Sequence, residues 1–243
     1  MLKNVNRILI IKLRDIGDIV LSTPVIQTMY ENCNSPKIVY VLKKEYENFK
    51  YLLPDVSEVI TYDKKSLLSF ITLIFRLRRY KFDIAINLHA TFRSALMARL
   101  SGAKLRLVHN HSGKDWFTSV PLGIKEEAKP ITLRDLETLK PLAIKMPPLN
   151  SIKTKLTIKE KDIKYIDDRL DANTAGFGIG AKRPAKMWKT ANFIELGKKL
   201  TEKKMKIAVF ASSSEREQGL QIVNAIGNNA KLYCGLDFLK LAF

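Results

Sequence analysis

The stretch Arg7–Pro24, with the sequence RILIIKLRDIGDIVLSTP, decides the fold class of this chain. Four consecutive aliphatic residues, Ile8 to Ile11, are typical of a fully buried strand. A charged turn with Gly17 and Asp18 follows, and a helical sequence comes after it. Ligands of open α/β sheets bind outside the carboxyl ends of the strands, so this turn is the first candidate ligand site.

The rest of the N-terminal half repeats this alternation of strand and helix. Such alternation predicts a parallel sheet with helices on both of its faces. Pro24 indicates either the first turn of a helix capped by Thr23 or a kink in a helix that begins at Gly17. The expected strands are 7–12, 37–42, 58–62, 82–88 and 104–108, and the expected helices are 19–32, 44–52, 66–79, 91–101 and 131–145.

A second α/β run begins near residue 173. The segment MPPLN, residues 146–150, ends the preceding helix, and a charged, partly helical stretch over 153–171 follows it. We therefore expect an N-terminal Rossmann-like domain over 1–150, a linker over 151–172 and a C-terminal Rossmann-like domain over 173–243. The elements expected in the second domain are strands 175–179, 206–211 and 231–234 and helices 191–203 and 215–227.

The second domain is expected to be incomplete. Its pattern provides about three strands, whereas doubly wound domains usually need roughly 100 residues or more. The mostly apolar residues 236–243 begin a helix that carries no capping signal. A truncated domain is the favoured interpretation, and a short terminal helix packed on the domain is the alternative.

The composition indicates a globular protein with an anionic partner. The net charge of the 243 residues is +18, and the excess is spread over both halves. Such a field favours nucleic acid, an anionic membrane surface or phosphorylated substrates, with a general enrichment of surface lysine as the alternative. Nucleic acid is not expected, because aromatic interleaving and recognised binding modules are missing.

A cytoplasmic location is expected. Cys33 and Cys234 lie far apart without metal-type spacing, so we interpret them as reduced thiols. Lys3 and Arg7 are followed by only four consecutive apolar residues, so no secretory signal is predicted.

The expected helix 66–79 is strongly apolar and ends in three arginines, with Lys81 just beyond it. It is too short to span a bilayer, which needs about 20 apolar residues. One interpretation is a helix that lies on an anionic membrane with its arginines at phosphate level. The other is an ordinary buried helix with basic residues favoured at its carboxyl end.

Several cofactor and catalytic motifs are missing from the sequence. No Gly-x-Gly-x-x-Gly fingerprint follows the first strand, and neither a Walker sequence nor a Gly-x-Ser-x-Gly elbow occurs. His89, His109 and His111 do not form a metal set with nearby carboxylates. We therefore expect no cofactor and no metal.

Two clusters could carry chemistry. Asp18 either caps the following helix or serves as a general base, kept ionised by Lys12 or Arg14, while Gly17 lets the backbone approach a ligand. The second cluster is a basic loop between a strand and a helix, which suits phosphate groups, with a solvated turn as the alternative. Trp188 is expected to anchor this loop, residues 180–189, whose cations are Lys182, Arg183, Lys186 and Lys189.

Four segments, in this order, resemble glycosyltransferase family nine, the heptosyltransferases. RILIIKLRDIGDIVLSTPVIQTM resembles the N-terminal signature of the family, and FDIAINLHATFRSALMARLSGAKLRL resembles its internal strand–loop–helix with an Arg-Ser pair. GIGAKRPAKMWKTANFIELGKKL and KIAVFASSSEREQGLQIV resemble the opening of its second domain. The resemblance implies a GT-B fold, with two facing Rossmann-like domains and parallel sheets.

The implied reaction is the inverting, metal-independent transfer of heptose from an ADP-activated donor to the inner core of lipopolysaccharide. Asp18 matches the base of the family, and Lys186 matches the contact to the donor phosphates, with Lys182 and Arg183 beside it. The acceptor side would be lined by Lys12, Gly17 and Arg93. The implied partners are a nucleotide-sugar donor, a phosphorylated lipopolysaccharide core and an anionic membrane surface, with the protein peripheral on the inner face of the inner membrane.

The sequence departs from the family pattern in two places. An Asp-(Ser/Thr)-Gly-x-x-His element that holds the donor has no copy here, and the usual histidine near residue 132 is replaced by Thr132 or its neighbours. We therefore expect a nearly complete acceptor half and a shortened donor half. The alternative function is a truncated, catalytically inactive module that binds anionic glycolipid.

Overall fold

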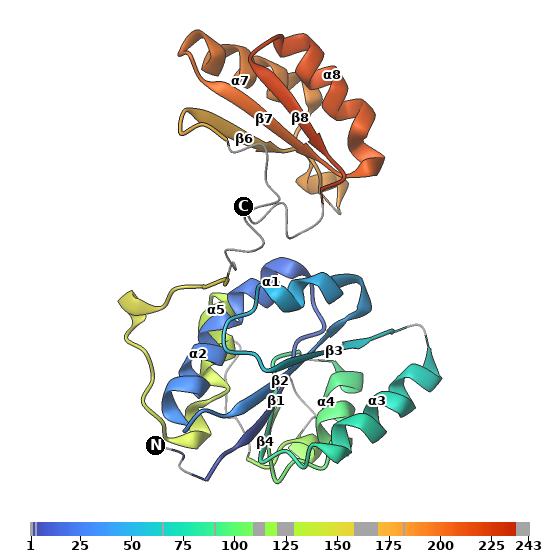
Figure 1. Ribbon diagram of the computed structural model, residues 1–243, viewed down its shortest axis with the longest axis vertical. Helices are drawn as coiled ribbons and strands as arrows, with labels where there is room; N and C mark the ends of the chain where they lie inside the picture. The colour runs from blue at the N-terminus through green and yellow to red at the C-terminus, as the bar shows by residue number, and fades with distance from the viewer. Residues whose placement is uncertain are drawn as a thin grey trace. The chain divides into compact units, whose positions relative to one another are not determined.

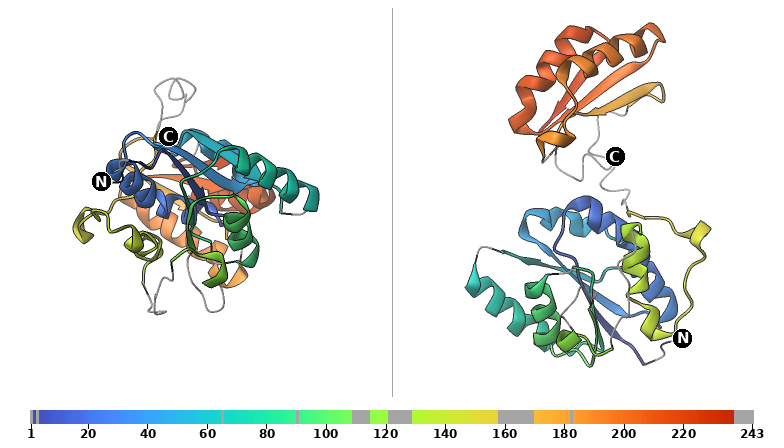
Figure 2. Two further views of the ribbon diagram at one scale, coloured as in Figure 1. Left: turned by 90° about the horizontal axis from the view of Figure 1, so that it is seen from below. Right: turned by 180° about the vertical axis from the view of Figure 1, so that it is seen from behind.

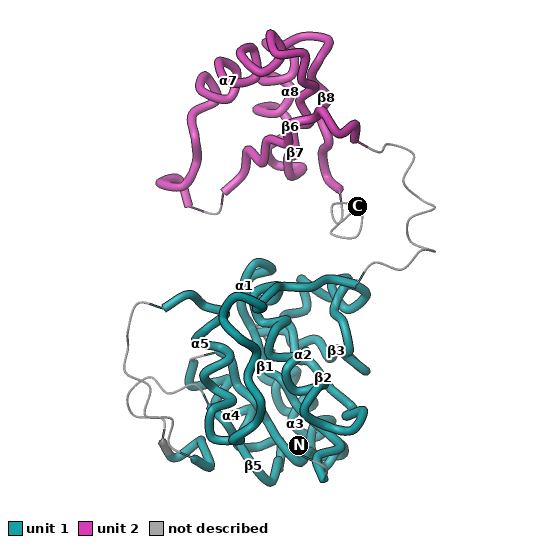
Figure 3. The backbone as a smooth tube through the Cα atoms, turned by 90° about the vertical axis from the view of Figure 1, so that its left-hand side faces the viewer, with its two compact units in different colours: residues 1–157 teal, residues 158–243 magenta. Residues whose placement is uncertain are grey.

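The computed structural model describes residues 2, 4–64, 66–89, 91–108, 115–120, 129–157, 170–181 and 183–236. The chain divides into two compact units, residues 1–157 and 158–243 (Figure 3). The division falls within the stretch 151–172 that the sequence indicates as a linker. Residues 152–157 belong to unit 1, and residues 158–169 lie outside the described part of the chain.

Unit 1 is built on a five-stranded parallel sheet in the order β3-β2-β1-β4-β5 (Figure 1). This is the order of a Rossmann-like half, and its five strands match the five expected ones apart from small shifts at their ends. The strands are β1 (Arg7–Ile11), β2 (Lys37–Lys43), β3 (Glu58–Tyr62), β4 (Ile84–Asn87) and β5 (Leu105–Val108).

Helices cover both faces of this sheet, as Figures 1 and 2 show. On one face, α3 (Leu67–Arg79) and α4 (Phe92–Leu100) enclose a core with the alternate strand residues Leu9, Ile11 and Val39. On the other face lie α1 (Ile16–Leu21), α2 (Thr23–Asn32) and α5 (Ile131–Glu137). Burial on both faces explains why the strands read as continuous aliphatic runs.

The expected helix 19–32 is two helices that meet at Ser22. Pro24 lies in the first turn of α2, but the N-cap is Ser22, so the expected cap, Thr23, is wrong. The Ser22 hydroxyl is buried between the Ile19 carbonyl, 2.7 Å away, and the Tyr40 hydroxyl, also 2.7 Å away. The residue at the break between the helices therefore also contacts strand β2.

Two other expected helices differ from the prediction. The segment Lys44–Tyr51 forms a 3₁₀ helix, and α5 ends at Glu137 instead of continuing to residue 145. Pro141 explains the second difference, because proline lacks the amide donor and its ring clashes with the carbonyl four residues earlier. A short 3₁₀ turn, Lys140–Leu142, takes the place of the expected helical end.

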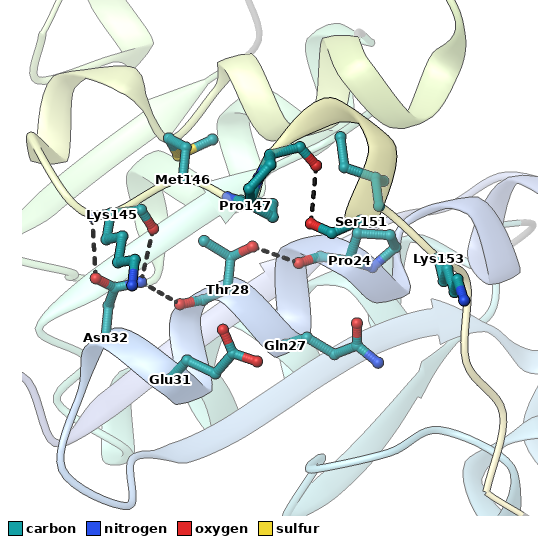
Figure 4. Close-up of a pocket in the computed structure, with 12 residues that line it drawn as sticks. Pro24, Gln27, Thr28, Glu31, Asn32, Lys145, Met146, Pro147, Ser151 and Lys153 are labelled. Carbon is teal, nitrogen blue, oxygen red and sulfur yellow. Dashed lines mark hydrogen bonds between the residues drawn. The ribbon is translucent and has the colours of Figure 1, made fainter.

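The chain leaves unit 1 along α2 as a strap, which we define as residues 143–157 (Figure 4). The Asn32 side chain fastens it: its amide donates to the Lys145 carbonyl (3.0 Å), and its oxygen accepts from the Lys145 amide (3.1 Å). Farther along, the Lys155 amide donates to the Thr23 hydroxyl (3.0 Å). Between strap and helix lies a groove of about 450 Å³.

Unit 2 has a three-stranded parallel sheet in the order β6-β7-β8, and the two α-helices among its described residues pack against each other. Its core contains Phe177, Phe193, Val209 and Ile222. The three expected strands and the expected helices 191–203 and 215–227 are present with small shifts at their ends, and the unit is smaller than unit 1. Residues 237–243, where a terminal helix is expected, lie outside the described part of the chain. Its elements are β6 (Thr174–Gly178), α7 (Thr190–Glu202), β7 (Lys206–Ala211), α8 (Arg216–Ile226) and β8 (Ala230–Cys234).

No helix within the described ranges is long and apolar enough to cross a membrane.

Candidate active site

The candidate site lies at the carboxyl edge of the sheet of unit 1. In the order β3-β2-β1-β4-β5, the direction of winding reverses between β1 and β4, and α/β proteins bind ligands outside such a switch point. Lys12 follows β1 directly, and His89 comes just after β4. Both segments therefore end at the place where this topology forms a ligand site.

Lys12 is a buried cation with one close partner. Its ammonium donates to the Asp135 carboxylate on α5 at 2.6 Å, and its side chain is 2% exposed. Burial lowers the pKa of Lys12 and raises the pKa of Asp135 to about 6, while their mutual attraction opposes both shifts. The sequence predicts that Lys12 lines the acceptor side, and the structure places its ammonium in a buried pair with Asp135, so a direct contact with an acceptor stays a prediction.

Asp18 is not the cap of its helix. It is the third residue of α1, and Asp15 occupies the N-cap position, so the capping alternative for Asp18 is wrong. The Asp15 carboxylate accepts from Lys43 (3.2 Å) and from the Tyr46 hydroxyl (2.9 Å). The partly exposed Asp18 carboxylate, in contrast, makes no hydrogen bond or ion pair with a described residue.

The charge of Asp18 is felt by the buried groups around it. It stabilises the charged form of Lys12 and opposes ionisation of Asp135. Gly17 beside it is exposed, and a Cβ atom there would meet no atom within 4 Å. The surface next to the Asp18 carboxylate is therefore open to a ligand.

His89 is a member of this site that sequence reasoning missed. It is half-buried, and its Nδ1 has no hydrogen-bond partner in the described part of the chain. Burial, together with the charges of Arg14, Lys12, Lys43 and Lys64, lowers its pKa to about 4. The sequence feature that could have identified His89 is its position just after a buried strand, because such positions lie at the edge of a parallel sheet where ligands bind.

Arg93 begins α4 at the same edge. Its guanidinium donates to the Tyr62 hydroxyl (3.1 Å) and to the Lys64 carbonyl (2.8 Å), which links α4 to the end of β3. Two of its five donors have these partners, and the side chain is exposed. Arg93 is therefore held in a position where its other donors remain available to an anion.

A largely apolar groove of about 750 Å³ opens beside α1. Leu21 lines it, and Leu21 lies three residues after Asp18, which places the two on one side of the helix. Thr132 also lines this groove, so the position that differs from the family histidine lies close to α1. The groove therefore lies at the carboxyl end of α1, the helix that carries Asp18, although Asp18 itself does not line it.

The basic loop of unit 2 lies between β6 and α7. Lys186 ends a 3₁₀ turn, and Arg183, Lys186 and Lys189 are exposed and free of ion pairs within the described ranges. Lys182 lies outside the described residues. Trp188 contacts the core residue Phe193 edge to face, with ring centroids 4.9 Å apart, which confirms its expected anchoring role.

The family model of glycosyltransferase family 9 (heptosyltransferase) matches residues 70–236, which include parts of both units. The chain belongs to glycosyltransferase family 9. No curated protein sequence matches it. The family assignment made from the four sequence segments is therefore confirmed.

Solved structures show the same fold. A family 9 glycosyltransferase from Veillonella parvula has a TM-score of 0.79 at 21% identity, over 96% of this chain and 70% of that one. ADP-heptose lipopolysaccharide heptosyltransferase II from Escherichia coli also has a TM-score of 0.79 at 21% identity, over 97% of this chain and 75% of that one. The structure of E. coli heptosyltransferase WaaC with ADP has a TM-score of 0.77 at 16% identity, over 97% of this chain and 77% of that one. The family 9 chain thus has the expected GT-B fold, with a smaller second domain.

Asp135→Ala tests the buried pair of this family 9 protein. The substitution leaves the Lys12 ammonium buried without its partner, so we expect the free energy of unfolding to fall by about 3–5 kcal/mol. The double variant Lys12→Met/Asp135→Leu replaces both charges with apolar groups and should lose much less. Urea unfolding of the three proteins measures this, and equal losses in the two variants would contradict the charge-based explanation.

His89 should make the stability depend on pH. The unfolded chain binds a proton at the imidazole below about pH 6.5, whereas the folded protein does so only near pH 4. The contribution of His89 therefore lowers the free energy of unfolding as the pH falls between these values. Asp135 has the opposite effect on the free energy of unfolding between pH 3.8 and about 6. Its contribution cancels when the parent protein is compared with a His89 variant, because both contain Asp135.

The measurement is urea unfolding of the parent protein and His89→Gln in steps from pH 6.5 down to pH 4. The variant should gain stability relative to the parent as the pH falls. A constant difference between the two proteins would show that the imidazole is not held neutral.

Proposed function

We propose that this chain is an inverting glycosyltransferase that transfers heptose from an ADP-heptose donor to the phosphorylated inner core of lipopolysaccharide. The observation that carries the proposal is the partly exposed Asp18 carboxylate, which has no partner among described residues and lies at the topological switch point. Membership of family 9 supports this reaction class. The solved WaaC structures that contain ADP and ADP-2-deoxy-2-fluoro heptose support a nucleotide-sugar donor.

Asp18 acts as the general base of this reaction. Its carboxylate removes the proton from an acceptor hydroxyl while that oxygen attacks the anomeric carbon. The new glycosidic bond forms on the face opposite the donor diphosphate, and the bond from the anomeric carbon to the diphosphate oxygen breaks. The configuration at this carbon is inverted, and ADP leaves with the bonding electron pair.

Cations of both units bind the anionic reactants. Arg93, Arg14 and Lys64 at the edge of unit 1 attract the phosphates of the acceptor, with the buried Lys12 adding to the field. The groove at the carboxyl end of α1 gives the acceptor room beside the helix that carries Asp18. In unit 2, Lys186 contacts the donor diphosphate and stabilises its charge as it departs, and Lys182 and Arg183 contribute from the same loop.

The direct test is incubation of the purified chain with ADP-heptose and a heptose-free lipopolysaccharide core. Mass spectrometry of the core should show the added heptose. If no heptose is added while the core still binds, the chain is a glycolipid-binding module instead.

Asp18→Asn should lower the transfer rate by about 10²–10⁴-fold, because the amide cannot accept the proton. The fold should not suffer, since the carboxylate has no hydrogen bond or ion pair within the described ranges. Asp15→Asn is the matched control, because it removes a carboxylate that is already engaged by Lys43 and Tyr46. An Asp18→Asn protein as active as the parent would refute the base assignment.

Lys186→Ala should lower kcat/KM for the donor by about tenfold to a hundredfold, the range for losing a hydrogen bond to a charged group. The side chain is exposed, so the melting temperature should not change. Lys203→Ala, which removes an exposed cation at the end of α7, is the control and should leave kcat/KM unchanged. Equal losses in both variants would point to the general charge of unit 2 instead of a specific contact.

A further inference from the structure

Helix α3 has apolar side chains on two opposite sides. One side is buried against the sheet and α4 through Leu73 and Leu77. The other side carries four large apolar residues that are exposed to solvent. These are Leu67 (74% exposed), Leu68 (75%), Ile71 (44%) and Phe75 (66%).

The four exposed residues form one stripe along the helix. Their spacing of one, four and eight residues from Leu67 places them within about a quarter of the helix circumference at 3.6 residues per turn. Scattered exposed apolar residues are ordinary, whereas a contiguous stripe on a surface helix marks an interaction site. We call this stripe the α3 apolar face.

Cations predominate along the α3 apolar face, most clearly at its carboxyl end. Arg78 and Arg79 end α3 and Lys81 follows, while α3 itself contains no acidic residue. At the amino end, Lys64 stands next to the acidic Asp63. Arg76 is already paired with Glu58 at 2.8 Å, so it is engaged within the unit. The face therefore combines apolar surface with positive charge that is concentrated at the carboxyl end of the helix.

We propose that the α3 apolar face docks unit 1 onto an anionic phospholipid bilayer, with Leu68 and Phe75 inserted among the acyl chains and Arg78 and Arg79 at the phosphates. This inference assigns the contact with an anionic membrane surface, expected from the sequence, to one specific face of unit 1, separate from the two substrates of the proposed reaction. A helix lying in the interface needs one apolar side and cations at headgroup level, and α3 has both. Its 13 residues are too few to cross the bilayer.

A second copy of the chain is a poorer fit to the same face. Two α3 helices packed antiparallel would bring Arg78 and Arg79 of one copy against Lys64 of the other, and parallel packing would bring the arginines together. Such like-charge contacts are unfavourable in an interface. A bilayer instead offers phosphate groups directly above its apolar interior.

Docking through α3 would hold the candidate site close to the membrane surface. Arg93 of the site donates to the carbonyl of Lys64, which lies just before α3. Parallel βαβ topology places the start of α3 at the carboxyl edge of the sheet, where Asp18 also lies. An acceptor carried by a lipid anchor would thus be presented to this edge.

The test is cosedimentation of the purified chain with vesicles of phosphatidylcholine mixed with phosphatidylglycerol. Leu68→Gln/Phe75→Gln should weaken vesicle binding on the order of tenfold or more, because two apolar side chains no longer enter the bilayer. Leu196→Gln/Leu220→Gln removes exposed apolar side chains from α7 and α8 and should leave binding unchanged. Both pairs are exposed, so the melting temperatures should remain close to that of the parent.

Charge is tested by a second matched pair. Arg78→Glu/Arg79→Glu should weaken binding about tenfold or more, whereas Lys198→Glu/Lys203→Glu, with the same change in net charge, should have a much smaller effect. Equal effects would show that binding follows the net charge of the chain and would overturn the proposal. It would also be overturned by unchanged binding of Leu68→Gln/Phe75→Gln, or by self-association without lipid that this variant abolishes.

These results are independent of glycosyl transfer. ADP binding, measured by calorimetry on the same variants, reports on the proposed function alone. If the parent chain binds ADP but does not bind the vesicles, the proposed docking surface is wrong, while the proposed reaction is unaffected.

Discussion

The buried ion pair between Lys12 and Asp135 joins the carboxyl end of the central strand β1 to α5, across 123 residues of sequence. An ammonium group with 2% exposure is tolerable only with such a partner, because burying a lone charge is very costly. Helix α5 in turn contacts α1, which carries Asp18. The shape of the candidate site thus depends on a charge pair that a ligand does not need to touch.

The two acidic residues of the turn after β1 have different surroundings and therefore different uses. Asp15 is engaged by Lys43 and Tyr46 and fixes the turn to β2 and the segment that follows it. Asp18, three residues later, is the acidic group left open in a region where cations predominate. One carboxylate therefore stabilises the loop, while the other has no partner among the described residues and is available for the role of the proposed base.

Local sequence patterns predicted the strands well, because burial on both faces demands the aliphatic runs that mark them. They failed where a distant residue decides the outcome. The buried Ser22 hydroxyl at the break between α1 and α2 contacts Tyr40 on β2, and the buried Lys12 ammonium is paired with Asp135. No short-range pattern reveals either contact. The family resemblance directed attention to Asp18, but only the structure shows that Asp15 occupies the cap position.

Helix α3 shows why two sequence interpretations need not exclude each other. The alternatives for residues 66–79 were a buried helix and a helix on an anionic surface. The first describes one side of α3, and the proposed docking would account for the exposed apolar side. Leu73 and Leu77 are buried in the core on the sheet side of α3, yet apolar side chains continue around the helix to positions that the sheet does not cover. An apolar pattern wider than the stripe of about 100° that faces a core is therefore information about a second environment.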